Sequence, residues 1–231
     1  MTSAMERIVN LSDMPERLRG GVVAIGNFDG VHRGHRVVLE RALEEAKVIG
    51  APPLVLTFDP HPRQVFRPDV PHFRLTPTDM KARLISALGF DAMVELPFSR
   101  EFAAQSAEEF IERILVSGLG IRHVVTGFDF HFGKDRRGGP AFLMASGEAH
   151  GFRVALVDAF RETSERTQLL ITSHSPHLVD LFPTENIRVV TMIDGETRVT
   201  RIRASQQAAI KEHLLSLEQI MSAEGLLPED T

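Results

Sequence analysis

The chain has 231 residues, of which 43% are apolar and 25% are charged, enough for one sizeable core or two small ones. Its formal net charge of -5 argues against sequence-independent binding to nucleic acid or to an anionic membrane, because such binding depends on Lys and Arg neutralising phosphates. The absence of cysteine excludes a disulfide framework and a thiol nucleophile. The opening MTSAMERIVN lacks the apolar run of a signal peptide, so we expect a cytoplasmic protein with no nucleic-acid or membrane partner.

Short β-branched runs alternate with amphipathic helical segments over the first two thirds of the chain. The predicted strands are VVAIGN, PLVLTF, DAMVEL, RHVVTG and FRVALV. The predicted helices cover residues 34–48, a segment that ends near Gly89, residues 106–115 and residues 141–150. Ser106 and Glu109 predict a capping box at the start of the third helix. This βαβ succession predicts an α/β fold with a doubly wound parallel sheet.

Three loops that follow predicted strands look unlike ordinary turns. They cover residues 26–35, 58–67 and 127–139. In open sheets of this type a ligand binds outside the carboxyl ends of the strands. We therefore expect the three loops to converge on one edge of the sheet and to form the binding site there.

The first loop, GNFDGVHRGH, has the features of a phosphate site. Gly26 and Gly30 permit backbone conformations and close approaches that other residues do not allow, and the helix that follows points free N–H groups at its N-terminus. His32 and His35 are three residues apart, so they can share one side and donate hydrogen bonds to phosphate oxygens as charge develops. The alternative interpretation is a pair of surface histidines beside a tight turn.

Residues 20–160 resemble the HxGH nucleotidyltransferase superfamily, with its Rossmann-like fold, and more narrowly the FMN adenylyltransferase module of bacterial bifunctional riboflavin kinase/FAD synthetases. The resemblance rests on an ordered set of segments: GNFDGVHRGH, LTFDPHPRQVF, RLTPTDMKARLISALGFD, SAEEFIERIL and VVTGFDFHFGKDRRGG. It implies adenylyl transfer from ATP to FMN with Mg²⁺, giving FAD and pyrophosphate.

The resemblance also implies roles for residues of the first loop. His32 and His35 would be the catalytic groups. The ATP phosphates would be held by Gly26, Asn27, Phe28, Gly30 and Gly34. No side chain is assigned as a metal ligand, and catalysis would consist of positioning and charge stabilisation without a covalent enzyme intermediate.

The second loop contains the run Asp-Pro-His-Pro, and its two prolines predict a rigid, extended path. On such a path His61, Arg63 and Phe66 could face a ligand, and the resemblance places His61 and Arg63 on the flavin side. The alternative interpretation is a proline-stiffened connection with a solvated arginine.

The third loop, GFDFHFGKDRRGG, interleaves phenylalanines with charged residues, which supplies stacking faces and cations for a flavin and its phosphate. Alternation with a period of two predicts that one set of these side chains faces the core. We assign Phe128 and Asp129 to the flavin site and leave Phe130 and Phe132 open between packing and binding.

Beyond residue 160 the sequence departs from the family, which there carries a Ser/Thr-x-Ile-Arg motif that contributes hydroxyls and an arginine to ATP. This chain has LLITSHSPHLVDLF, which predicts a strand and then a helix with hydroxyls at Thr172, Ser173 and Ser175 but no arginine. Ser173 is the candidate for a phosphate contact. A later TRIR, residues 200–203, follows a hairpin predicted around the Asp194-Gly195 pair, and we interpret it as a basic strand end.

The tail, residues 163–231, resembles the C-terminal end of ABC-like ATPase heads, with His174 at the position of the switch histidine. The chain has no Walker A sequence Gly-x4-Gly-Lys-Ser/Thr, so His174 would have no nucleotide to sense. We therefore predict a nucleotidyltransferase domain, residues 1–162, and an ATPase-like α/β extension, residues 163–231, with a structural role. Its apolar runs QLLIT and IRVVTMI are expected to pair with the exposed edge beside FRVALV.

Three functions remain open on the sequence. The first is FMN adenylyl transfer, impaired by loss of the arginine-bearing motif. The second is a catalytically inactive module that binds flavin or nucleotide, and the third, more distant, is an ABC-like ATPase fragment. A riboflavin kinase barrel is not expected, because only LFPTENI resembles that module.

Overall fold

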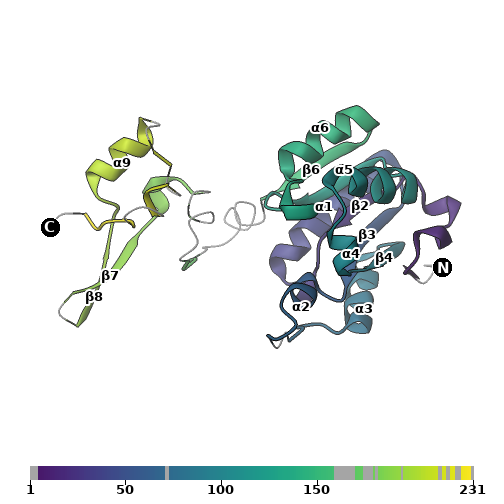
Figure 1. Cartoon of the computed structure of the whole chain (residues 1–231), viewed down its shortest axis with the longest axis horizontal. Coiled ribbons are helices and arrows are strands. Elements are labelled where there is room, and N and C mark those ends of the chain that lie inside the picture. Colours follow the sequence, from purple (N-terminus) through teal and green to yellow (C-terminus); the bar gives the residue numbers. More distant parts are fainter. Residues whose placement is uncertain are drawn as a thin grey trace. The chain divides into compact units, whose positions relative to one another are not determined.

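The computed structural model describes residues 5–70, 73–158, 170–173, 179, 182–193, 195–212, 215–216, 219–221 and 225–229 (Figure 1). The chain divides into two compact units, residues 1–169 and residues 170–231. Within the described residues, no helix combines the length and the apolar character that crossing a membrane requires.

A parallel sheet of six strands forms the centre of the first unit, in the order β1-β4-β3-β2-β5-β6. Its strands are β1 (Glu6–Ile8), β2 (Val22–Ile25), β3 (Pro53–Asp59), β4 (Ala92–Pro97), β5 (His123–Gly127) and β6 (Arg153–Val157). The five predicted strands are all present. Strand β1 was not predicted from the sequence, because three residues with one buried side chain are too short to show a period.

Helices cover both faces of this sheet. The helices of the first unit are α1 (Arg33–Ile49), α2 (Pro62–Phe66), α3 (Thr78–Leu88), α4 (Arg100–Ala103), α5 (Ala107–Phe110), a π-helical segment (Ile111–Gly118) and α6 (Pro140–His150). Along β2, Val22 and Ala24 pack with residues of α1 and α3, whereas Val23 and Ile25 pack with residues of α5 and the π-helical segment. Because every strand residue of β2 is buried on one face or the other, the predicted doubly wound α/β fold is confirmed.

The chain reverses direction across the sheet beside β2. From β2 it proceeds to β3 and then β4 on one side, and it later returns to place β5 on the other side of β2. Val23 is thus aligned with Leu54 on one neighbour and with Val124 on the other. Such a switch point leaves a crevice at the carboxyl ends of the strands, between the loops that follow them.

Two local predictions in this unit had different outcomes. The capping box is confirmed, since the Ser106 side chain accepts from the Glu109 N–H and the Glu109 carboxylate accepts from the Ser106 N–H. The extended path predicted for the second loop is wrong, because Pro62–Phe66 forms the short helix α2. Pro62 occupies the first turn, where its missing N–H costs nothing, and His61 caps the helix.

The second unit contains the antiparallel hairpin of β7 (Val189–Ile193) and β8 (Glu196–Thr200) and the helix α9 (Ala204–Lys211). The hairpin prediction is confirmed, and Gly195 at its turn has a φ of 81°. Strand β7 pairs with β8. The expected pairing of the apolar runs with the edge beside β6 would join the two units, and it stays a prediction. Of the strand predicted over QLLIT, the described residues 170–172 form neither helix nor strand, and His174 and Ser175 lie outside the described residues.

Candidate active site

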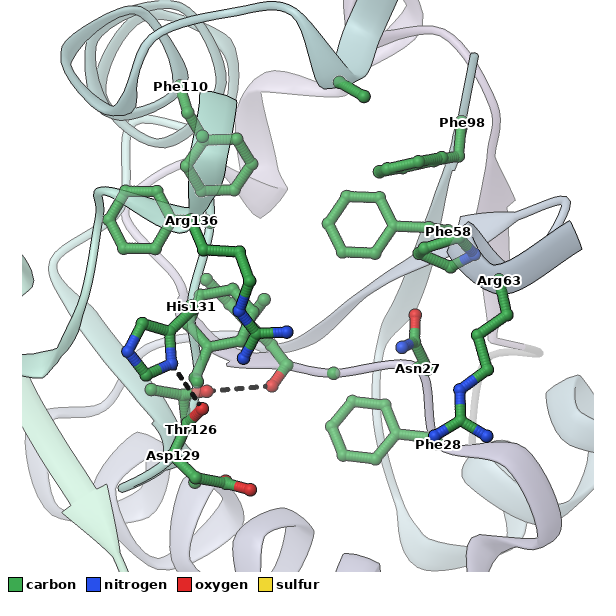
Figure 2. A pocket seen from close by; sticks show the side chains of 18 of the residues that line it. Asn27, Phe28, Phe58, Arg63, Phe98, Phe110, Thr126, Asp129, His131 and Arg136 are labelled. Atoms are coloured by element: carbon green, nitrogen blue, oxygen red, sulfur yellow. Dashed lines mark hydrogen bonds between the residues drawn. The ribbon is translucent and has the colours of Figure 1, made fainter. Parts of the chain in front are cut away.

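A cavity of about 1160 Å³ opens at the carboxyl edge of the sheet (Figure 2). Its lining comes from the loops that follow β2, β3 and β5, which confirms that the three loops converge. Ligand pockets commonly have volumes of about 300–1,000 Å³. This cavity is therefore slightly larger than a typical ligand pocket.

The first loop follows a tight and strained path. Three residues have positive φ angles: Phe28 (48°), Gly30 (82°) and Val31 (38°). For an L-residue other than glycine the left-handed region costs roughly 1–2 kcal/mol, and a β-branched side chain there is a strong outlier. A Cβ on Gly26 would lie 2.9 Å from the Phe28 ring, so the ring packs directly against the loop backbone. Backbone that is this close to an aromatic ring leaves no room for a side chain.

Asp29 ties this loop to the segment that precedes α3. Its carboxylate accepts hydrogen bonds from the Leu75 N–H (3.0 Å), the Thr76 N–H (2.9 Å) and the Thr76 hydroxyl (3.1 Å). The Gly30 N–H in turn donates to Thr76 Oγ1 at 2.9 Å. Burial raises the pKa of the Asp29 carboxyl, but these hydrogen bonds outweigh burial and hold the pKa below its usual range. The strained loop is thus fixed by an ionised side chain.

The two histidines of the HxGH sequence lie side by side at the start of α1. His32 is the N-cap residue, and its Nδ1 accepts from the His35 N–H at 3.3 Å. Their rings stack with centroids 3.6 Å apart and an interplanar angle of 19°. The His35 ring also meets the edge of Phe28 at 5.5 Å. The shared side that the spacing predicted is therefore confirmed, and both residues line the cavity.

His35 is an uncharged imidazole near neutral pH. Burial, followed by repulsion from His32, lowers its pKa from 6.5 to about 4. Its Nδ1 atom is buried and has no hydrogen-bond partner within the described protein. An anion bound nearby would favour the charged form and raise this pKa. A bound anion would therefore favour the protonated form of His35.

Phenylalanines from separate elements form one wall of the cavity. Ring centroids are 5.8 Å apart between Phe58 and Phe98, 5.5 Å between Phe98 and Phe102, and 6.4 Å between Phe102 and Phe110. Phe132 extends the series, 5.0 Å from Phe110. Figure 2 shows Phe58 and Phe98 to the right of the open space and Phe110 at its upper left. A wall of this kind suits a flat, apolar ring system.

The third loop brings its phenylalanines to the same cavity. Phe128, Phe130 and Phe132, which stand at every second position, all line it. Phe132 also belongs to the buried core and Phe130 packs against that core, so the expectation that one set faces the core is confirmed for these two rings. The chain leaves the strand at Gly127, and the Phe130 and Phe132 rings stack at 5.5 Å and 21°. Phe132 is both buried in the core and exposed to the cavity at one edge.

Most of the predicted site residues come together in this cavity. The lining includes Gly26, Asn27, Phe28, His32, Gly34, His35, Arg63, Phe128 and Asp129. Gly30 lies outside the lining and serves the loop through Thr76. His61 also lies outside it and caps α2, with its Nδ1 accepting from the Arg63 N–H at 3.1 Å. Ser173 belongs to the second unit, and a phosphate contact for it stays a prediction.

Several lining residues were not singled out in the sequence. Gln105 precedes the capping box, and its backbone carbonyl accepts from the Lys134 N–H at 2.7 Å, which joins the α4–α5 turn to the third loop. Arg136 points toward the middle of the open space in Figure 2. The side-chain oxygens Asn27 Oδ1 and Gln105 Oε1 are buried with no partner within the described protein. Such oxygens are acceptors for a hydrogen bond from water or from a ligand, or for an ion.

Comparison with known proteins assigns the first unit to a family. Residues 14–169 match the FAD synthetase family. Curated relatives include three proteins described as bifunctional riboflavin kinase/FMN adenylyltransferase. The chain is 42% identical to the one from Pseudomonas fluorescens over 150 residues, 38% identical to the one from Escherichia coli K12 over 159 residues, and 38% identical to the one from Listeria monocytogenes over 148 residues.

These matches cover 65%, 69% and 63% of this chain and 48%, 50% and 46% of the relatives. The chain therefore spans about half the length of the curated relatives it matches. A crystal structure described as a macrolide-efflux protein from Streptococcus pneumoniae is similar with a TM-score of 0.57 and 25% identity, over 67% of this chain and 50% of that one. Because the family match covers more than half of the residues, the chain belongs to the FAD synthetase family.

Proposed function

We propose that this chain transfers the adenylyl group of ATP to FMN in the cytoplasm, giving FAD and pyrophosphate. The observation that carries the proposal is a single cavity in which a strained glycine loop with two stacked histidines faces a wall of phenylalanines. Membership of the FAD synthetase family and the names of the curated relatives support the same reaction.

The nucleotide belongs at the first loop. Backbone groups between Gly26 and Phe28 and the N-terminus of α1 would hold the ATP phosphates, since helix N-termini favour anions. In the reaction a phosphate oxygen of FMN attacks the α-phosphorus, and the bond to the departing pyrophosphate breaks. His32 and His35 would donate hydrogen bonds to the α-phosphate oxygens, where negative charge develops. No covalent bond to the enzyme is needed.

The flavin belongs between the phenylalanines. Its ring system would lie against Phe58, Phe98 and Phe102, with Phe128 toward the first loop. Arg63 and Arg136 extend into the same space and would bind the FMN phosphate as charged donors (Figure 2). Asp129 supplies an acceptor at the cavity edge. His61 would act through the capping of α2, which carries Arg63, and not by contact.

The site suits a magnesium ion bound mainly through substrate. Within the described residues there is no group of three or more His, Asp or Glu side chains placed to hold a metal. The unpaired Asn27 Oδ1 and the Asp129 carboxylate are oxygen ligands in the cavity. Mg²⁺ commonly takes one or two protein oxygens together with phosphates and waters. When bound, it would neutralise phosphate charge.

The decisive experiment is incubation of the chain with FMN, ATP and Mg²⁺, followed by chromatography for FAD. The chain has no Trp and no Tyr, so after desalting a band near 280 nm reports bound ligand, and absorbance near 450 nm identifies flavin. We expect FAD to form. Stoichiometric FMN binding without FAD would instead support an inactive flavin-binding module, and failure to bind FMN would contradict both.

A further inference from the structure

A lysine is buried directly beneath the first loop. Lys81 lies near the start of α3 with 8% of its surface exposed. Its Nζ donates to the backbone carbonyl of Asn27 at 2.8 Å and to Thr57 Oγ1 at 3.2 Å. The Thr57 hydroxyl also donates to the Asn27 carbonyl, at 3.2 Å. Two donors from two different elements thus converge on one carbonyl oxygen of the loop.

The lysine has no close ion-pair partner among the described residues. The ion pairs within 4 Å do not include it, although Glu95, Asp29 and Asp59 act on it from farther away. Burial lowers the pKa of its ammonium, and the nearby Arg74 acts in the same direction. A buried charge without a close partner costs free energy, and an apolar side chain of similar size would be cheaper. Fold stability alone therefore does not account for Lys81.

The carbonyl that Lys81 holds lies where the loop becomes strained. Asn27 lines the cavity and stands between Phe28 and Phe58 in Figure 2. Phe28, directly after it, has a φ of 48°, and Val31 has a φ of 38°. Such conformations persist only where the surroundings over-determine them. Asp29 and Thr76 fix the far end of the loop, and Lys81 with Thr57 fixes the near end.

We propose that Lys81 is a positioning residue for the nucleoside triphosphate, because it fixes the Asn27 carbonyl and places a positive charge behind the phosphate-binding face of the first loop. The proposal rests on the proposed function. Lys81 acts through Asn27 and the electric field and makes no contact with substrate.

The Kd for ATP of three variants separates the effect of fixing the Asn27 carbonyl from the effect of the Lys81 positive charge. Lys81→Met removes the charge and the hydrogen bonds but keeps an apolar stem, and Thr57→Val removes one neutral donor to the same carbonyl. Arg83→Met is the matched control, because Arg83 lies on α3 and is exposed. We expect the Kd for ATP to rise about tenfold or more for Lys81→Met and about threefold for Thr57→Val, following the usual difference between charged and neutral hydrogen bonds. Arg83→Met should leave it unchanged.

The effect of the Lys81 positive charge can be measured without any ligand, by NMR titration of the His35 imidazole. His35 is surrounded by His32 and Lys81, which lower its pKa, and by Asp29, which raises it. Lys81→Met should therefore raise the pKa of His35, whereas Thr57→Val and Arg83→Met should leave it unchanged. Loss of a purely structural side chain would not give this pattern.

The outcomes are distinct. A folded Lys81→Met variant with wild-type ATP affinity and an unshifted His35 pKa would overturn the positioning role. A wild-type chain that binds neither ATP nor FMN would contradict the proposed function. The His35 titration would still decide whether the positive charge of Lys81 acts on the residues of the first loop. If Lys81→Met does not fold, unchanged ATP affinity in Thr57→Val overturns the proposal, since the carbonyl then needs no fixing.

Discussion

The two units of the chain use their apolar residues differently. In the first unit both faces of the sheet are covered, and the side chains of β2, for example Val22 and Ile25, are buried. In the second unit the hairpin leaves Val190, Met192 and Val199 exposed at 62%, 75% and 61%. The family match ends at residue 169, where the first unit also ends. In a parallel sheet covered on both faces, the loops that follow the strands emerge at the carboxyl edge, and that edge is where a site can form.

Removal of His32 or His35 should have the largest effect on FAD formation at the site in the first unit. His32→Ala or His35→Ala is expected to lower kcat by about 10²–10³, as for loss of a donor to developing charge, with much less change in FMN affinity. Steady-state FAD formation and FMN binding measure the two effects. A folded variant with wild-type turnover would show that the missing histidine has no phosphate role.

The next largest effect is expected from Gly26→Ala. The new Cβ would lie 2.9 Å from the Phe28 ring, so the ring or the loop must shift. Overpacking commonly costs about 1–3 kcal/mol of stability. If the loop moves and about 1.4 kcal/mol of ATP binding is lost, the KM for ATP should rise about tenfold. Gly139→Ala is the control, because its Cβ would meet only His131 at 3.5 Å and its φ is ordinary. Equal KM values for the two variants would refute a phosphate role for the Gly26 backbone.

A pH titration should report the burial of the His35 imidazole. In the ligand-free chain the His35 imidazole is expected to titrate near pH 4, since its pKa is lowered to about 4. The unfolded chain binds this proton near pH 6.5 and the folded chain does not, so the stability that neutral His35 contributes is present above about pH 6.5 and is lost as the pH falls through 4. NMR of the ring protons measures the titration. Addition of ATP should move it upward, and a titration unaffected by ATP would place the nucleotide elsewhere.

The smallest effect is expected in the second unit. Ser173→Ala should leave the KM for ATP within about twofold of wild type, as for substitutions outside a site. The reason is that every residue that lines the cavity belongs to the first unit. The same FAD assay measures it. A large rise in KM would instead show that Ser173 contacts phosphate, which the sequence resemblance also allows, and the contrast between the two units would then disappear.

Much of the fold and of the first loop could be predicted from the sequence. The strands and helices alternate with a clear hydrophobic period. In the first loop, the glycines and the three-residue spacing of His32 and His35 at a helix start predict a phosphate site. The phenylalanine wall could not be predicted, because Phe58, Phe98 and Phe102 come from separate elements and meet only in three dimensions.

Other features were missed because their sequence signal is ambiguous. A lone lysine on a helix such as Lys81 is usually exposed, so its burial beneath the first loop has no local signature. Prolines around His61 predicted an extended path, although a proline is equally suited to the first turn of a helix such as α2. The first feature depends on tertiary contacts that a period cannot report, and the second on a local sequence that fits two structures.

The third loop has a consequence for the adaptability of this protein. Asp135 and Arg136 are exposed, yet both have left-handed backbone conformations, with φ angles of 56° and 57°. Glycine at Asp135 should relieve the strain at that residue, because glycine adopts the left-handed region without cost. Glycine is also the most flexible residue, so the same change would loosen the backbone next to Arg136, which points toward the open space in Figure 2. Under the proposed function, a change that lowers backbone strain at Asp135 would therefore also weaken the orientation of an arginine that binds phosphate.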